Sequence, residues 1–153
     1  YHVERSKLAV QERFGTHDLV DAARVIRAIE LTRFPVPEAD SHRETGTEAG
    51  LLRAADLIGQ LGDPLYPRKL NALFHEFAEI GVNAELGYDS PADLAERYPS
   101  FFWGKIEPVI GDAIRFLDLT VEGRGWVANL YAHVFAIEHD RRRMGPHPGP
   151  GPL

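Results

Sequence analysis

The 153-residue sequence contains no cysteine, which excludes disulfide bonds and thiolate metal sites. It has no run of about 18 apolar residues, so the sequence predicts no membrane-spanning helix. Its first residues lack the basic segment and following apolar run of a secretory signal peptide. We therefore expect a cytoplasmic globular protein without a membrane partner.

Positively charged residues are also fewer than negatively charged ones. The chain has 17 Lys and Arg residues against 23 Asp and Glu residues, for a formal net charge of -6. Generic nucleic-acid binders neutralise phosphates with clustered cations. The basic run Arg141-Arg142-Arg143 stands at the end of the last predicted helix, where cations interact favourably with the helix dipole. The charge balance thus argues against a generic nucleic-acid binder.

Several catalytic motifs are missing as well. The sequence has no HExxH zinc motif and no GxSxG nucleophile elbow, and its glycines match neither a phosphate-binding loop nor a dinucleotide fingerprint. His17-Asp18 is a literal His-Asp dipeptide, a ligand pair known from metal phosphohydrolases. It stands at the entry to a predicted helix, where Thr16 and Asp18 are natural capping residues. We interpret it as a cap, with a metal site as the alternative.

Helical periodicity dominates the sequence, and no segment alternates as a strand would over more than a few residues. Proline, glycine and capping residues separate the periodic segments. A break is expected at Tyr98-Pro99 and a kink at Pro108. The pattern predicts an all-α single-domain bundle of about seven helices over residues 1–143. The Gly- and Pro-rich residues 144–153 are expected to form a disordered tail. The predicted helices span about 4–14, 16–32, 47–62, 67–80, 90–98, 101–119 and 125–142.

One predicted helix carries a carboxylate in an unusual setting. In residues 51–60 (LLRAADLIGQ), Asp56 is bordered by apolar surface on the helical wheel. The strongly polar residues Arg53, Asp56 and Gln60 share one strip, at i, i+3 and i+7. A carboxylate beside apolar surface needs a cation, a metal or hydrogen-bond donors. Two interpretations are open: Asp56 binds a ligand, or the strip is solvated and Arg53 pairs with Asp56.

The same helix resembles the last motif of the HD-domain metal-dependent phosphohydrolases, in which an R-A-A-D helix carries the final metal-binding aspartate. Residues 52–60 (LRAADLIGQ) carry this resemblance. Residues 3–9 (VERSKLA) resemble the E-E-R-S-A helix that follows the His-Asp dyad of the family, and residues 26–32 resemble the next helix. Residues 65–112 are similar to a bacterial subgroup that includes cyanobacterial members. The resemblance covers most of residues 1–140 and implies an HD-domain-like fold.

The resemblance implies metal-dependent hydrolysis of a small phosphorylated substrate, a nucleotide or another phosphoester. The metal would be divalent: Mn, Fe, Ni or Mg. Asp56 would be a metal ligand, while Arg53 and Gln60 would face the substrate or hold Asp56 in place. Glu4 would lie near the dyad and could orient the water. The first histidine and the dyad of the family precede the E-R-S segment, so they would lie upstream of Tyr1, and the metal site in this chain would be incomplete.

Two other interpretations remain. The chain could be a non-catalytic HD-like helical module that binds a nucleotide or a protein partner, its metal site lost. It could also be an unrelated all-α interaction domain in which the R-A-A-D string is a coincidence. The surroundings of Asp56 distinguish these cases. Other ligand side chains that converge on Asp56 would favour the HD type, whereas contact with bulk water alone would favour a coincidental R-A-A-D string. Whether the protein is a homodimer is left open.

Overall fold

The computed structural model describes residues 2–143, and every regular element in this range is helical. The predicted all-α fold of about seven helices is therefore confirmed. The predicted tail, residues 144–153, lies outside the described residues. Between residues 2 and 143, no helix has the length and apolar character needed to cross a membrane. In chain order the elements are α1 (His2–Phe14), α2 (Ala22–Leu31), the 3₁₀ helix η1 (Asp40–His42), α3 (Glu48–Leu61), α4 (Tyr66–Glu79), α5 (Val82–Leu86), α6 (Pro91–Phe101), the π-helical segment η2 (Phe102–Ile106), α7 (Glu107–Leu117) and α8 (Val121–Arg143).

Capping side chains mark where three of the helices begin. Asp21, Thr47 and Ser90 each accept a hydrogen bond from the backbone N–H three residues further on, at 3.0, 3.2 and 3.1 Å respectively. Such bonds satisfy a backbone donor that has no partner within the helix. The starts predicted at Thr47 and Ser90 are thus confirmed.

The start of α2 differs from the prediction. Its cap is Asp21, whereas Thr16 and Asp18 lie in the connection between α1 and α2. In that connection Nδ1 of His17 accepts a hydrogen bond from the backbone N–H of Leu19 at 3.2 Å. Because the local hydrogen bonds form turns, the helix starts later than the sequence pattern indicates. The interpretation of His17-Asp18 as a helix cap is therefore wrong.

The stretch from α6 to α7 is more continuous than predicted. The break expected at Tyr98-Pro99 is wrong, because α6 continues through Pro99 to Phe101. Both Tyr98 and Pro99 are buried, and packing of this face outweighs the hydrogen bond that proline removes. The helix then widens in η2, where the carbonyl of Phe102 accepts from the N–H of Glu107, five residues on. Pro108 is the second residue of α7 and follows directly on this π-helical turn.

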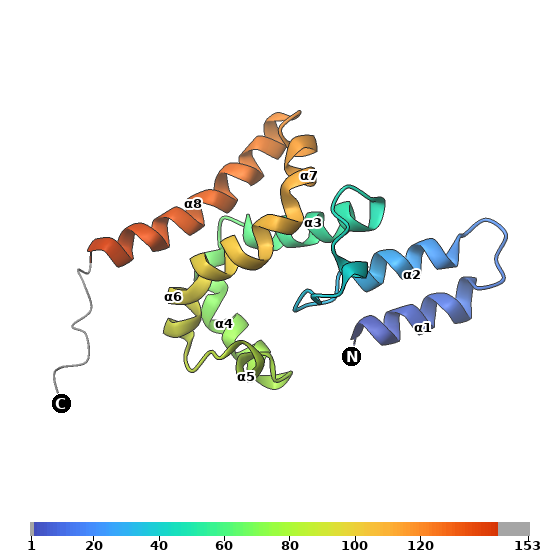
Figure 1. Ribbon diagram of the computed structural model, residues 1–153, viewed down its shortest axis with the longest axis horizontal. Coiled ribbons are helices and arrows are strands. Elements are labelled where there is room, and N and C mark those ends of the chain that lie inside the picture. The colour runs from blue at the N-terminus through green and yellow to red at the C-terminus, as the bar shows by residue number, and fades with distance from the viewer. Residues whose placement is uncertain (1, 144–153) are drawn as a thin grey trace.

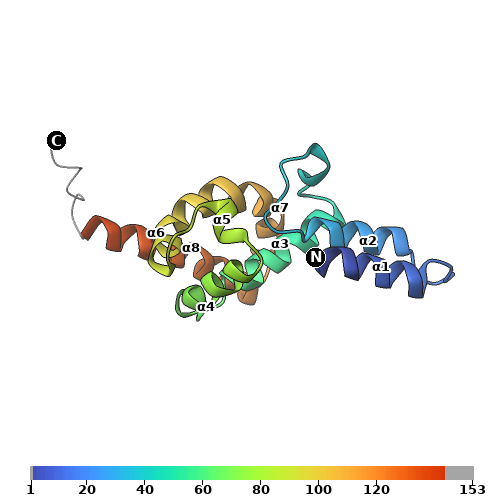
Figure 2. The same cartoon turned by 90° about the horizontal axis from the view of Figure 1, so that it is seen from below.

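The helices form a central group with an extension at each end (Figure 1). At one end α1 and α2 lie side by side as an antiparallel pair, as the second view also shows (Figure 2). The pair joins the centre through α2, which packs against α3. At the other end the C-terminal half of α8 runs away from the remaining helices (Figure 1).

The core lies where α3, α4, α6, α7 and the middle of α8 meet. Its side chains are apolar, and burying each large one contributes about 1.5–3 kcal/mol. The largest fully buried core side chains are Phe102, Ile106, Ile110, Leu130 and Val134.

Charged side chains hold the α1–α2 pair together. Glu30 on α2 accepts hydrogen bonds from Nε of Arg33 and Nζ of Lys7, both at 2.7 Å. Its Oε1 also lies 3.2 Å from Nε2 of the buried His42. The hydrogen bonds from Arg33 and Lys7 hold the pKa of Glu30 well below its usual range. Glu30 therefore links α1, α2 and η1 as an ionised group.

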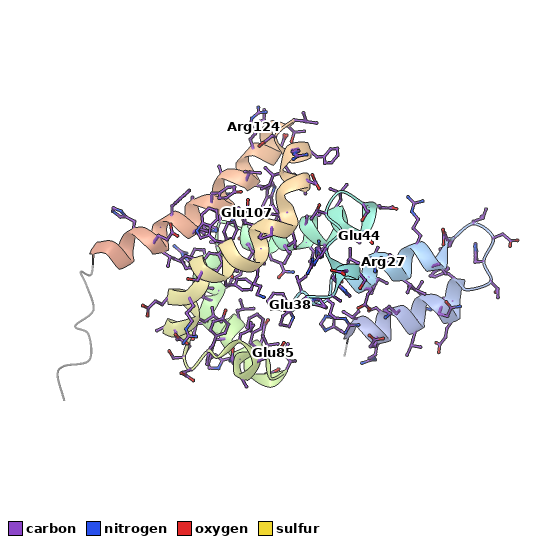
Figure 3. The ribbon with its side chains drawn as sticks, viewed as in Figure 1. Arg27, Glu38, Glu44, Glu85, Glu107 and Arg124 are labelled. Carbon is purple, nitrogen blue, oxygen red and sulfur yellow. The ribbon has the colours of Figure 1, made fainter. Side chains whose placement is uncertain are left out.

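A second group of bonds secures the segment between η1 and α3. Nη2 of Arg27 donates to the carbonyl of Ser41 at 2.5 Å and to Oε1 of Glu44 at 2.6 Å. Figure 3 shows Arg27 and Glu44 together at this junction. The outer face of α2 is thereby attached to the segment that leads into α3.

We expect Glu30→Gln to lower the free energy of unfolding at pH 7 by about 1–2 kcal/mol, because the hydrogen bonds from Arg33 and Lys7 weaken when their acceptor loses its charge. The pKa of Glu30 is lower in the folded protein than in the unfolded chain. Its stabilisation is therefore complete above the unfolded value and is lost as the pH falls toward the folded value. The deficit of the variant should shrink between about pH 5 and pH 2 in urea titrations. Glu12→Gln, on the exposed face of α1, is the control. A Glu30→Gln deficit as large at pH 3 as at pH 7 would contradict the prediction.

Candidate functional site

Asp56 lies on the exposed side of α3, at the edge of a cavity. Its Oδ1 accepts a hydrogen bond from Nε2 of Gln60 at 2.9 Å, one helical turn further on. Asp56 and Gln60 both line a cavity of about 690 Å³. The carboxylate that the sequence places beside apolar surface thus stands at the mouth of a cavity, with an amide as its hydrogen-bond partner.

Arg53 is not on the exposed strip predicted for it. Only 1% of its surface is exposed, and burial lowers the pKa of its guanidinium. Nη1 donates to the carbonyl of His42 at 2.5 Å, and Nη2 donates to the carbonyl of Glu44 at 2.6 Å. These loop carbonyls need donors, and the long arginine side chain reaches them. The predicted Arg53–Asp56 pair is therefore replaced by Gln60–Asp56, and Arg53 holds the segment before α3.

Glu4 is separated from the cavity wall by its ion pairs. Its carboxylate binds Arg33 and lies 3.3 Å from Nζ of Lys7. The hydrogen bonds from Arg33 and Lys7 lower the pKa of Glu4. His2 and Arg33 line the cavity, whereas Glu4 is not among its lining residues. The structure therefore does not bring Glu4 together with Asp56.

Aromatic rings from separate elements form much of the cavity wall. Phe34, in the connection after α2, stacks on Phe77 of α4 with ring centroids 5.6 Å apart. It also meets the edge of Phe101 of α6 at 5.9 Å. The ring centroids of Tyr66 and Tyr98 lie 5.2 Å apart, and both residues line the same cavity. An apolar cavity of this volume is within the range of small-molecule sites, about 300–1,000 Å³.

Tyr98 buries a polar atom behind this aromatic wall. The residue is 2% exposed, and its hydroxyl has no hydrogen-bond partner among the side chains described, those of residues 2–139. Burial raises the pKa of Tyr98, so the hydroxyl keeps its proton at neutral pH and can donate a hydrogen bond. A buried polar group without a partner costs about 1–3 kcal/mol. The hydroxyl is itself closed off from solvent, so the structure leaves it as an unpaired polar atom inside the protein.

Carboxylates determine the charge at the cavity mouth. Nζ of Lys69 is ion-paired with Asp63 at 2.5 Å, and Arg33 is ion-paired with Glu30 at 2.7 Å. These two basic side chains are therefore compensated, and the third Lys or Arg residue of the lining, Arg53, is buried and donates to backbone carbonyls. Asp56 and Glu76 also line the cavity and add negative charge to it. A phosphorylated ligand would be repelled at this mouth unless a cation accompanied it.

The described residues do not by themselves fit a divalent metal. Among the side chains that the structure describes, those of residues 2–139, no three His, Asp or Glu converge as a metal site requires. Catalytic metal sites usually have about three protein ligands. His17 and Asp18 lie in the connection beyond α1, at the far end of the α1–α2 pair (Figure 1). A metal on Asp56 would need further ligands from outside the described range.

The sequence matches the model of the Npun_R2479-like family over residues 1–140. The chain belongs to this family. The match extends from α1 into α8 and includes Asp56 and every residue of the cavity wall. Comparisons with curated proteins and with solved structures found no significant match. The function of this Npun_R2479-like chain is therefore argued from its site.

Arg53→Met should lower the free energy of unfolding by about 2–4 kcal/mol, because the buried carbonyls of His42 and Glu44 lose their donors. Arg124→Met is the matched control: Arg124 is exposed and donates to the carbonyl of Asp118 at 2.8 Å. Its removal should cost less than about 0.5 kcal/mol. Urea unfolding followed by circular dichroism measures both. Equal losses in the two variants would show that Arg53 is not a structural anchor.

Proposed function

We propose that this chain contributes the substrate cavity and one metal ligand, Asp56, to a metal-dependent phosphohydrolase site of the HD-domain type. One observation carries the proposal: the carboxylate of the R-A-A-D segment lies at the mouth of a cavity of about 690 Å³. The substrate would be a small phosphorylated molecule, a nucleotide or another phosphoester.

The hydrogen bonding of Asp56 suits this role. Gln60 donates to Oδ1 at 2.9 Å and so orients the carboxylate, leaving its other oxygen for a cation. A divalent cation, Mn, Fe, Ni or Mg, would offset the charge of Asp56 and Glu76, which otherwise disfavours a phosphoester at the mouth. Its other ligands would come from beyond the described residues, and a second molecule in a homodimer is one source.

In this proposal Arg53 acts indirectly. Arg53 lines the cavity, but its guanidinium binds the carbonyls of His42 and Glu44, so its role is to position α3 and the preceding segment. Glu4 has no part in it, because its carboxylate is bound by Arg33 and Lys7. The proposal also places the protein in the cytoplasm, which agrees with a sequence without cysteine.

A second candidate function is non-catalytic binding of a nucleotide or of a protein partner. One observation favours it: among the described side chains of residues 2–139, no group of three His, Asp or Glu that could hold a metal includes Asp56. In that case Asp56 and Gln60 would contact a polar group of the ligand directly, and no metal would be needed.

Asp56→Asn tests the first proposal, because it removes the charge but keeps the size of the side chain. We expect metal-stimulated release of phosphate from a panel of phosphomonoesters and phosphodiesters to fall at least about 100-fold. The assay uses the protein at its natural length with Mn²⁺, Fe²⁺, Ni²⁺ or Mg²⁺, and elemental analysis measures the bound metal.

Asp18→Asn is the matched control, since Asp18 is an exposed aspartate in the α1–α2 connection. Its activity should stay within about twofold of the unmodified protein. Equal activity of Asp56→Asn and the unmodified protein would exclude a ligand role for Asp56. Nucleotide binding without hydrolysis under any metal would favour the second candidate function.

A further inference from the structure

Helix α8 lacks charged residues where a surface helix usually has them. Residues 125–137 contain no Asp, Glu, Lys or Arg, although α8 lies at the edge of the molecule (Figure 1). One side of this stretch packs into the core through Leu130 and Val134, which are fully buried. Surface helices normally place charged residues on the side that points away from the core. The composition of α8 therefore indicates that another surface covers its second side.

The exposed side of α8 forms a regular and largely apolar face. At about 100° per residue, its positions lie within about 40° of the direction opposite Leu130. They follow one another at intervals of four and three residues, which is the spacing of a coiled-coil seam. Its largest apolar members are Val121, which is 74% exposed, and Phe135, which is 55% exposed. The outer face of α8 comprises six exposed residues: Val121, Gly125, Ala128, Ala132, Phe135 and His139.

The outer face is complementary to itself. Its six positions are arranged symmetrically about Leu130, so a second α8 that runs antiparallel meets the same sequence of positions. In that register Phe135 lies opposite Gly125 of the second copy, and Ala128 lies opposite Ala132 of the second copy. The largest side chain thus faces the smallest residue, and the alanines at the centre let the two helices approach closely. A two-fold axis repeats each of these pairs.

Charged side chains beside the outer face match in the same orientation. Arg124 is exposed near the start of α8, where Nη1 donates to the carbonyl of Asp118 at 2.8 Å (Figure 3). Near the other end, Oε1 of Glu138 accepts a hydrogen bond from Nε1 of Trp103 at 3.0 Å, which orients the carboxylate. Arg124 and Glu138 lie on the same flank of the outer face. Antiparallel packing brings Arg124 beside Glu138 of the second copy, whereas parallel packing would separate them by about 21 Å along the axis.

We infer that the chain forms a homodimer in which the outer face of α8 packs antiparallel against the outer face of a second copy. The apolar positions supply the contact, and the two Arg124–Glu138 pairs select the antiparallel orientation more than they add affinity. The inference is independent of the proposed function, because the residues that line the cavity all lie within residues 2–106.

Sedimentation equilibrium of the full chain tests the inference. The average mass should rise from that of a monomer toward that of a dimer between about 1 and 300 μM. Ala132→Arg places two long cations at the centre of the interface and should raise the dissociation constant at least about tenfold. Ala78→Arg is the matched control, because Ala78 is an exposed alanine of α4. Its dissociation constant should change less than about twofold.

Thiol cross-linking tests the orientation of the two helices. The 153 residues contain no cysteine, so each substitution introduces their only thiol. In the antiparallel dimer Val121→Cys lies opposite His139→Cys of the second copy, but two copies of either variant hold their thiols about 27 Å apart along the axis. A short bismaleimide should therefore cross-link the mixture of the two variants and neither variant alone. Val121→Cys mixed with Ala78→Cys controls for chance collisions and should stay uncross-linked.

Each outcome supports or overturns the inference. A chain that stays monomeric at 300 μM overturns it, as does a folded Ala132→Arg variant that dimerises like the unmodified chain. Cross-linking of Val121→Cys with itself would show a parallel pair and would also overturn it. If circular dichroism shows that Ala132→Arg does not fold, the cross-linking result decides. A monomer that binds vesicles of phosphatidylcholine and phosphatidylglycerol would assign the outer face to a lipid surface instead. Dimerisation with the expected cross-link supports the inference whatever Asp56→Asn does to hydrolysis.

Discussion

The guanidinium of Arg53 is the constraint on which the remaining structure depends. Burying a cation is costly unless it is hydrogen-bonded, and the carbonyls of His42 and Glu44 accept hydrogen bonds from Nη1 and Nη2, while Nε has no partner among the described residues. The segment that carries these carbonyls is in turn bound by Arg27 of α2 and, through His42, lies beside Glu30. One buried side chain therefore fixes the junction of the α1–α2 pair and α3. The same helix presents Asp56 and Gln60 at the cavity mouth.

The sequence predicted helices well where the signals were local. Thr47 and Ser90 are recognisable caps, because a cap is made by a side chain and a backbone N–H three residues apart. The start of α2 was misplaced because two aspartates compete within four positions, and only Asp21 caps the helix. At Pro99 the local rule predicts a break, yet burial of the surrounding side chains overrides it.

The candidate site was only partly predictable. Asp56 and Gln60 were found because they lie one turn apart on a helix whose sequence resembles a known motif. Arg53 was misplaced because periodicity gives the direction of Cβ and not the path of a long side chain. The cavity was not predicted at all. Its rings, Phe34 and Phe101 among them, come from segments that meet only in the folded chain.

The π-helical segment η2 has a consequence for how the family can vary. A π turn is equivalent to one additional residue in an α-helix. It lets Phe101 and Ile106 contribute to the cavity while Phe102, between them, is wholly buried in the core. Losing that residue would rotate everything downstream by about 100° relative to α6. Relatives could therefore reshape the cavity by inserting or deleting a single codon in η2. None of the aromatic residues that line the cavity would have to be substituted.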